Sequence, residues 1–343
     1  GMVCRFSKDA ELLSSFGWGS GCSGDSVFED KNGNISVGAS PNHFLLFDSE
    51  GTSVKHVRNS YTSPPWDMTA TPDGFGSPCA YVMVGRNYIC SLDAEHNILR
   101  HRVGNVEYKR VIALQDKIVA SGKADVRNGT LAAFDPQLNL IKAATVHAGD
   151  NIGFTGLAKV DGGWVAAGTL NHTSKWKSIL MVRFDEDFNV VNKANLSAGG
   201  QNELYSMFAR QDGGFLLAGT TTYNTVGGGD ALIIDVDDDF TPRQALSFGG
   251  TRDDYAYSIT RQSDGTSAVA GYLSLVGAGA TDAFLIRLRG SFADITGSMP
   301  KYPQVRINGQ VAVSKDATIP LTYSNTPVVT LTDSTAWGSH QVV

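Results

Sequence analysis

The sequence predicts an all-β protein assembled from a repeat of roughly 40 to 50 residues, the length of one four-stranded sheet with its turns. Two landmarks recur in one register, at intervals of 51 and 52 residues. They are an Asp-Gly turn, at Asp161, Asp212 and Asp264, and a strand end reading Ala-Gly, at Gly168, Gly219 and Gly271. Each apolar run is short, alternates with a period of two and closes at Gly, Asn or Asp, which is the pattern of strands and hairpins.

A third landmark extends the repeat toward the N-terminus. It is an alternating apolar strand that ends in aspartate, and it recurs at intervals of 45, 42, 50 and 52 residues, at Asp48, Asp93, Asp135, Asp185 and Asp237. Phe284–Leu288 has the same pattern, with Arg289 in place of the acid. We therefore expect six units of similar length.

The last full unit shows the order of elements within a repeat. We expect an inner strand over Tyr255–Arg261, a second strand over Ser267–Gly271, a third over Phe284–Leu288 and then an outer strand. An Asp-Gly turn between the first two supplies the positive φ of a tight hairpin. Four strands in this length form one blade of a β-propeller. Blades pack face to face around a ring, which explains how 343 residues avoid needing two separate cores.

The two chain ends predict how the ring closes. Val3–Phe6 resembles a third strand and Leu12–Gly17 an outer strand, so the chain begins halfway through a blade. Strand-like segments at residues 304–307, 311–313 and 328–331 would supply the missing inner strands. We favour seven blades, with N-terminal and C-terminal strands sharing one; the alternative is six blades plus a tail. Residues 2–290 then hold the blades, and residues 291–343 form a C-terminal β segment that completes the last blade or stands apart.

The last full unit contains five segments typical of one repeat family: Phe248-Gly249-Gly250, Asp253 to Ile259, Asp264-Gly265, Val269 to Tyr272 and Asp282 to Leu288. In these segments the repeat resembles that of uncharacterised, often secreted, bacterial and archaeal β-propeller proteins. The resemblance implies a propeller fold and an extracellular or cell-surface location. It implies no catalytic residue.

Charge and composition limit the partners. The formal net charge is −6 and no run of five like charges occurs, so we expect no nucleic-acid partner. No apolar stretch approaches the roughly 20 residues that span a bilayer. A cytoplasmic location follows if Met2 is the native start. The four cysteines lack metal-binding spacing, and we expect free thiols, with a Cys79–Cys90 bridge across a hairpin as the alternative.

No motif for catalysis, a cofactor or a metal is present. There is no Gly-x-Ser-x-Gly elbow, and Gly227-Gly228-Gly229 precedes a strand, whereas a phosphate loop must open a helix. Asp235–Asp239 resembles the opening of a calcium loop, but Phe240 stands where glycine is required. We interpret it as a solvated acidic turn between strands. Four acidic residues begin inner strands, and we expect them to cap turns rather than hold Ca²⁺: Asp25, Glu203, Asp253 and Asp254.

Aromatic residues in predicted loops are the candidates for ligand binding. An exposed ring can stack on a sugar or anchor a protein partner, although packing against a neighbouring blade is the commoner fate of such rings. Together with two of the acids, the candidate site residues are Trp18, Trp66, Trp176, Tyr223, Glu203 and Asp253.

Three hypotheses for function follow. The first is a non-catalytic binding or scaffold module that presents loops on one face to a protein or a glycan. The second, resting on analogy of fold, is a glycoside hydrolase or lyase that uses carboxylates at the channel mouth. The third is a structural component of a cell surface or virus particle, attached through the tail after Ser291.

Overall fold

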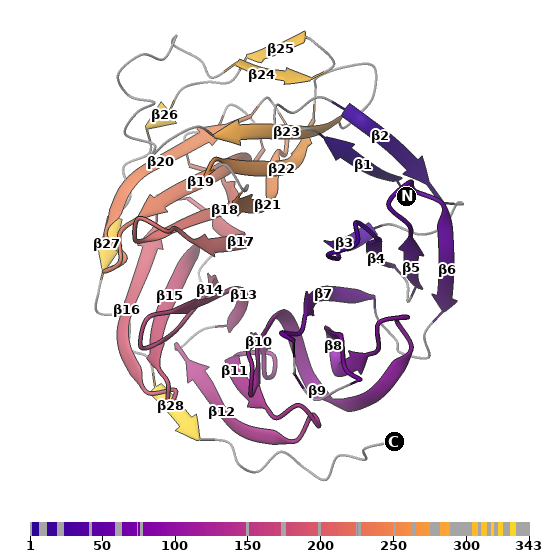
Figure 1. Cartoon of the computed structure of the whole chain (residues 1–343). Coiled ribbons are helices and arrows are strands. Elements are labelled where there is room, and N and C mark those ends of the chain that lie inside the picture. The colour runs from indigo at the N-terminus through magenta and orange to yellow at the C-terminus, as the bar shows by residue number, and fades with distance from the viewer. Residues whose placement is uncertain are drawn as a thin grey trace. The chain divides into compact units, whose positions relative to one another are not determined.

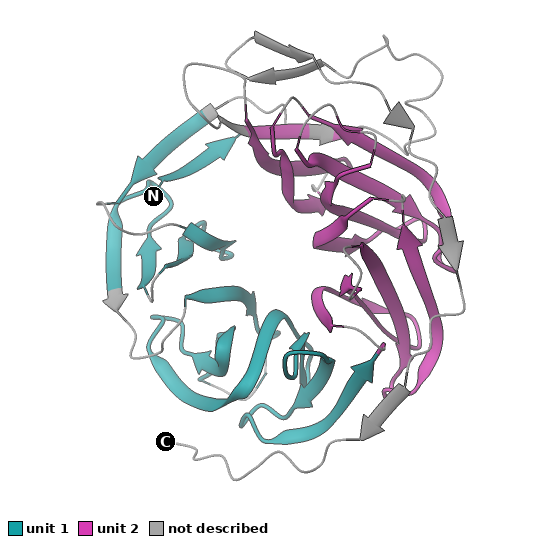
Figure 2. Ribbon diagram, turned by 180° about the vertical axis from the view of Figure 1, so that it is seen from behind, with its two compact units in different colours: residues 1–7, 11–147, 330–343 teal, residues 8–10, 148–329 magenta. Residues whose placement is uncertain are grey.

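The computed structural model describes most of the chain. The described residues are 2–6, 12–18, 24–40, 43–58, 64–73, 75, 78–148, 151–172, 176–197, 200–223, 225, 228–249, 252–261, 265–274, 282–288, 304–307, 310–313, 317–318, 322–324 and 330–333. Within these ranges the regular structure is all strand, with no helix. The chain divides into two compact units (Figure 2).

Unit 1 comprises residues 1–7, 11–147 and 330–343. Its strands are β1 (Met2–Phe6), β2 (Leu12–Gly17), β3 (Gly24–Glu29), β4 (Ile35–Ala39), β5 (His43–Phe47), β6 (Ser53–Arg58), β7 (Pro65–Ala70), β8 (Tyr81–Leu92), β9 (Ile98–Ala113), β10 (Ile118–Lys123), β11 (Gly129–Phe134), β12 (Leu140–His147) and β28 (Thr330–Asp333).

Unit 2 comprises residues 8–10 and 148–329. Its strands are β13 (Asn151–Val160), β14 (Gly163–Asn171), β15 (Lys177–Asp185), β16 (Val190–Ser197), β17 (Asn202–Ala209), β18 (Phe215–Thr221), β19 (Asp230–Val236), β20 (Pro242–Phe248), β21 (Tyr255–Arg261), β22 (Ser267–Leu273), β23 (Asp282–Leu288), β24 (Gln304–Ile307), β25 (Gln310–Val313), β26 (Ala317–Thr318) and β27 (Thr322–Ser324).

The sheets of unit 2 follow the predicted repeat. Antiparallel meanders run β13 to β16 and β17 to β20, and β21 to β23 give the first three strands of another repeat (Figure 1). The three strands predicted for the last repeat are all confirmed, and the second and third each extend two residues further than predicted. Strand alternation and turn chemistry in the sequence are therefore sufficient to locate these elements.

Unit 1 contains a four-stranded sheet, β3 to β6, and a longer sheet in which two repeats are joined. The Ala80 N–H donates to Leu92 O at 2.7 Å, so β8 doubles back on itself, and Asn87 adopts φ 72° at the bend. Strand β9 then serves as the last strand of one repeat and the first strand of the next. Each repeat again has four strands.

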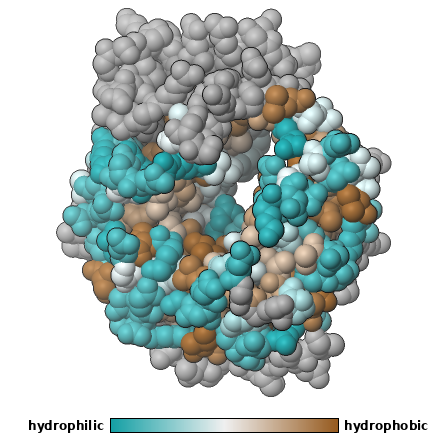
Figure 3. Space-filling view, in the orientation of Figure 1, coloured by the Kyte–Doolittle hydropathy of each residue, from teal (hydrophilic) through white to brown (hydrophobic). Residues whose placement is uncertain are grey.

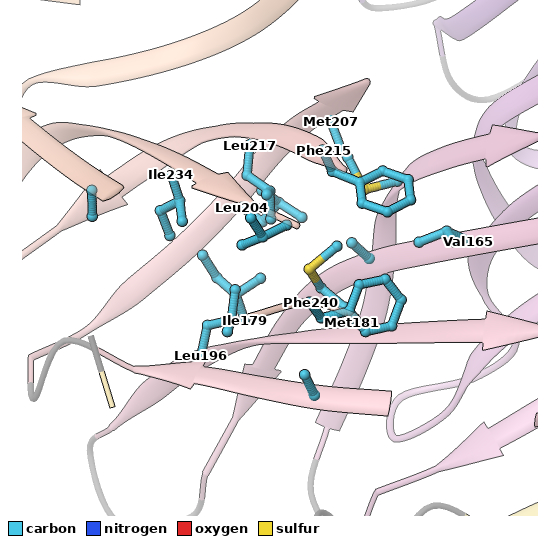
Figure 4. Close-up of a cluster of buried hydrophobic side chains, with 14 of the residues drawn as sticks. Val165, Ile179, Met181, Leu196, Leu204, Met207, Phe215, Leu217, Ile234 and Phe240 are labelled. Carbon is cyan, nitrogen blue, oxygen red and sulfur yellow. The ribbon is translucent and has the colours of Figure 1, made fainter. Parts of the chain in front are cut away.

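Apolar side chains fill the space between successive sheets. In unit 2 the buried cluster of Figure 4 joins β13–β16 to β17–β20, with Met181 and Leu196 on one side and Phe215 and Phe240 on the other. A second cluster joins β17–β20 to β21–β23, around Phe248 and Phe284. Sheets that are buried on both faces must have apolar residues at consecutive positions, and β18 and β19 are buried along their entire length.

The recurring aspartates form one kind of turn. Asp185 accepts the backbone N–H of Asn189 at 2.8 Å and its side-chain amide at 2.9 Å. The residue before that asparagine, Phe188, has φ 61°. The same turn with a positive φ at its fourth residue recurs after Asp48, Asp93, Asp135 and Asp237. The acidic run around Asp237 is therefore a turn between β19 and β20, as predicted.

The chain ends pair differently from the prediction. β1 and β2 pair with each other, and Val3, Phe16 and Trp18 pack on the core of β3–β6, as a separate blade would. Among the described residues no tail strand pairs with β1 or β2. Instead β26 pairs with β20, β27 with β16 and β28 with β12, and β24 pairs with β25. In each of three sheets the outermost strand offers an edge with unpaired backbone groups, and a short tail strand pairs with that edge.

Three remaining features bear on the sequence predictions. Cys4, Cys79 and Cys90 are free thiols, and burial raises the pKa of Cys79 and Cys90. Cys22 lies outside the described residues. Hydrophilic and hydrophobic residues are intermixed on the face drawn in Figure 3. No helix in the described part of the chain has the length and hydrophobicity needed to cross a membrane.

Candidate functional site

The first strand of each repeat in unit 2 contains a β-bulge at the same place. In β17, Leu204 is opposite Gly219 and Ser206 is opposite Ala218, so Tyr205 is the additional residue. In β21 the additional residue is Tyr257, and in β13 it is Thr155. A bulge bends its strand and changes the direction of a side chain. Each repeat therefore presents one specially oriented side chain from its first strand.

The same bulge occurs three times in unit 1. The additional residues are Asp25 in β3, Trp66 in β7 and Lys109 in β9. Consecutive first strands lie beside one another: β3 next to β7 and β7 next to β9 in unit 1, and β13 next to β17 and β17 next to β21 in unit 2. The bulged residues within one unit therefore form a row.

The Ala-Gly landmark explains the bulge. A Cβ on Gly219 would lie 1.8 Å from Glu203 O, and one on Gly271 would lie 1.8 Å from Tyr255 O. Those carbonyl oxygens precede the bulged tyrosines by two residues, so a side chain in place of either glycine would clash with the bulged strand. Gly122 and Gly168 meet Glu107 O and Gly153 O in the same way.

Four tyrosine rings gather beside the bulges of unit 2. Tyr205 lies 5.0 Å from Tyr257, and Tyr257 lies 5.5 Å from Tyr255 with the rings nearly parallel. Tyr272 of β22 lies 5.0 Å from Tyr255 and 5.6 Å from Tyr257, all between ring centroids. Tyr257 is 45% exposed and the other three are half-buried. The rings touch one another, so they form an aromatic surface and leave no space between them for a ligand.

A carboxylate and an ammonium border this tyrosine cluster, which we define as Tyr205, Tyr255, Tyr257 and Tyr272. Glu203 pairs with Lys177 and also accepts the Tyr205 hydroxyl at 3.1 Å. Burial, together with the Glu203 charge, raises the pKa of Tyr205, and burial raises the pKa of Tyr257 to about 12. These phenols are therefore protonated at neutral pH. The cluster offers ring faces, hydroxyl donors and one compensated ion pair.

The other predicted acidic residues hold loops in place. Asp253 accepts the Gly229 N–H at 2.8 Å, and Asp254 is buried and accepts the Ser274 N–H at 2.7 Å. Asp25 is exposed and accepts the Ser40 hydroxyl at 2.8 Å. These carboxylates bond to neighbouring loops rather than to their own turns, which corrects the expected partners. No group of three or more metal-ligating side chains is placed to hold a metal ion among the described residues.

The predicted aromatic candidates lie in different surroundings. Trp18 is half-buried and packs near Phe47, with ring centroids 6.3 Å apart. Tyr223 is half-buried against the core cluster of β13–β20. Trp176 is 53% exposed and directly precedes Lys177, the partner of Glu203. Trp66 lies within β7, at its bulge, rather than in a loop. Of the six predicted site residues, Glu203 is hydrogen-bonded to the tyrosine cluster, and burial together with the charge of Asp253 raises the pKa of Tyr255.

The tyrosine cluster and Lys109 are not among the site residues predicted from the sequence. The sequence did contain a signal for them. The glycine of each Ala-Gly pair lies opposite a bulge. The bulged residue comes two positions after the residue whose carbonyl oxygen lies against that glycine. In the last two repeats that residue is Tyr205 and Tyr257. Comparing the bulge position across repeats would have identified both.

No protein-family model matches the chain, and no curated protein matches its sequence. Solved structures do match its fold. The WD40 propeller domain of Doa1 matches with a TM-score of 0.59 at 14% identity, covering 85% of this chain and 87% of that domain. The Neurospora crassa Pan2 WD40 domain matches with 0.52 at 12% identity, covering 78% and 79%. A chain of the mitotic checkpoint complex matches with 0.57 at 12% identity, covering 83% and 82%.

The chain is therefore a β-propeller, and its sheets are the blades. Identities this low establish the fold alone, because one propeller scaffold supports many unrelated functions. In this fold the first strand of each blade is the inner one, so the bulged residues belong to the inner strands.

Proposed function

We propose that the chain is a non-catalytic binding propeller, and that its ligand is a glycan held at the tyrosine cluster. The observation that carries the proposal is the contiguous surface of four tyrosine rings beside the Glu203–Lys177 pair. Tyrosine combines a rigid apolar face with a polar hydroxyl, so it can stack on the face of a sugar and bond its hydroxyl groups.

The size and charge of the surface favour a glycan over a protein. A protein interface commonly buries about 800 Å² on each partner around apolar anchors. Tyr257 is the only exposed large hydrophobic residue of the cluster, so the cluster alone lacks the several exposed apolar anchors of a protein interface. The Glu203 and Lys177 charges compensate each other, which favours a neutral sugar over a charged group.

The rings do not favour a cationic ligand. A quaternary ammonium is bound by rings that stand apart and surround it. Here neighbouring centroids lie 5.0 to 6.0 Å apart, and Lys177 already compensates the Glu203 carboxylate. A hydrolase would need a pair of free carboxyl groups on either side of a bound sugar. Glu203 and Asp253 are instead engaged by Lys177 and Gly229.

We also propose seven blades. Six repeats each have a bulged inner strand, and β1–β2 packs on β3–β6 as a seventh, incomplete blade. The paired strands β24 and β25 are the available candidates for its missing inner strands. A chain ending at residue 290 is expected to unfold at lower urea concentration than the full chain; equal stability of the two would favour six blades plus a separate tail.

Binding can be tested with a glycan array followed by calorimetry. The array identifies the best glycan for the full-length protein, and titrations then compare Tyr257→Ala and Glu203→Gln with Tyr223→Phe, which lies outside the cluster. We expect the first two variants to weaken binding tenfold or more, because removing an aromatic anchor costs about 2 kcal/mol, and the third to bind normally. An array without any hit, or equal binding by all variants, contradicts the proposal.

A further inference from the structure

Lys109 has an unusual environment in the inner strands of unit 1. It is the bulged residue of β9, and its Nζ lies 3.1 Å from the centroid of the Trp66 ring, the bulged residue of β7. The side chain is half-buried. In the described part of the chain no hydrogen-bond acceptor and no carboxylate contacts this ammonium, which has three N–H donors. Partly buried donors normally find partners, so this ammonium can donate to an acceptor of a ligand.

Lys159 of unit 2 shows what a satisfied lysine over a tryptophan looks like. Its Nζ lies 5.3 Å from the Trp164 ring centroid. The same Nζ donates to Val160 O at 2.8 Å, to Gly163 O at 3.1 Å and to Glu186 Oε1 at 2.6 Å. Lys109 has the cation–π contact without the acceptors, and the difference identifies a place for an oxygen-bearing group.

The charges around Lys109 come from its own strand and from three others. Glu107 and Arg110 lie on β9, Arg86 on β8 and Asp25 on β3. Arg86 pairs with Glu107 at 3.0 Å, and Asp25 accepts the Ser40 hydroxyl. Asp67 of β7 accepts the Val111 N–H at 2.9 Å, and burial raises its pKa. Each of these carboxylates thus has another partner, although the charges of Glu107 and Asp25 also act on Lys109.

We propose that Lys109 and Trp66 form a second binding site, separate from the tyrosine cluster, that takes the carboxylate of an acidic sugar or another small carboxylic acid. A carboxylate offers two acceptor oxygens to an ammonium that lacks them. The charges of Glu107 and Asp25 already act on this ammonium, so a singly charged group is favoured over a phosphate dianion. The Trp66 ring supplies the apolar surface beside the charge.

Titrations of the full-length protein with glucuronate, acetate and glucose test the site. Glucuronate is expected to bind, and glucose is not expected to bind here. Lys109→Gln should weaken glucuronate binding tenfold or more, whereas the matched variant Lys159→Gln should leave it unchanged. Lys109→Arg, which keeps the charge, should retain part of the affinity and shows that loss in the glutamine variant is not a folding defect.

Acetate separates the two sources of the carboxylate. Binding of acetate as tight as that of glucuronate assigns the site to small carboxylic acids, and weaker acetate binding assigns it to acidic sugars. Absence of binding by both overturns the proposal, as does equal binding by wild type and Lys109→Gln. Neutral glycans on the tyrosine cluster are measured separately, so either proposal can fail alone.

The pH dependence gives a second readout. Burial lowers the pKa of Lys109 to about 8, with Glu107 opposing and Arg110 and Arg86 adding to the shift. A carboxylate pairs with the protonated amine, so binding should be strongest below about pH 8 and should fall as the pH rises through that value. An ordinary exposed lysine would hold the ligand up to about pH 10. Affinity that stays constant from pH 7 to 9.5 would contradict the assignment to Lys109.

Discussion

The inner strands of the two units share the same β-bulge, but the side chain at the bulge differs from strand to strand. In unit 2 the bulged residues are Thr155, Tyr205 and Tyr257, and in unit 1 they are Asp25, Trp66 and Lys109. At four of the six bulges a glycine on the partner strand makes room for a carbonyl oxygen of the bulged strand. The bulged position itself is left free to vary. The propeller can therefore change its binding chemistry blade by blade without changing its fold.

The largest expected effect comes from replacing the glycine opposite a bulge in either unit. In Gly122→Ala and Gly219→Ala the new Cβ would lie 1.9 and 1.8 Å from a backbone carbonyl oxygen. The strands must separate, so we expect each variant to lose about 3 kcal/mol of unfolding free energy or more, measured by urea unfolding.

Gly162→Ala provides the control for these variants. Gly162 has φ 73°, and within the described part of the chain no atom beyond its two neighbours lies within 4 Å of the position that a Cβ would take. Only backbone strain therefore opposes the change, and a cost of about 1 kcal/mol is expected there. If Gly219→Ala is no more costly than Gly162→Ala, the glycine is not what permits the bulge.

Acid sensitivity should distinguish the units. His96 of unit 1 occupies the positive-φ turn position that Phe188 and Phe240 occupy in unit 2. It is buried and stacks on Tyr81 at 4.5 Å, and burial lowers its pKa, with the charge of Asp30 opposing and that of Lys55 adding to the shift. The unfolded chain binds a proton more readily than the folded one, so stability should fall as the pH drops below about 6.5.

His96→Phe should remove this dependence. Urea unfolding at pH 7 and pH 5 is expected to show a smaller loss of stability for the variant than for wild type. Equal losses would mean that other groups, such as Asp30 or Asp93 nearby, determine the acid response.

The smallest effect concerns the turns that the two units share. Asp135→Ala in unit 1 and Asp185→Ala in unit 2 each remove hydrogen bonds to the backbone and to an asparagine side chain. Each is expected to cost about 1 kcal/mol. Asp187→Ala in the same turn should be neutral, and a cost equal to that of Asp185→Ala would show that the turn does not depend on the recurring aspartate.

The strands and turns were predictable from the sequence because they depend on local chemistry. Alternation located Tyr255–Arg261, and the recurring aspartates marked real turns. The tyrosine cluster required more than local chemistry, because Tyr205 and Tyr257 come from different repeats and meet only after the blades pack. The pairing partners of the tail strands could not be predicted from local sequence either, since strands of two to four residues can pair with any open edge.

The most direct test of the binding surface is an NMR titration of protein with labelled tyrosine rings. A bound glycan found on the array should shift the ring signals of Tyr205, Tyr255, Tyr257 and Tyr272, and should leave that of Tyr223 in place. Shifts confined to Tyr223, or saturating binding without any change at the four clustered rings, would contradict glycan binding at the tyrosine cluster.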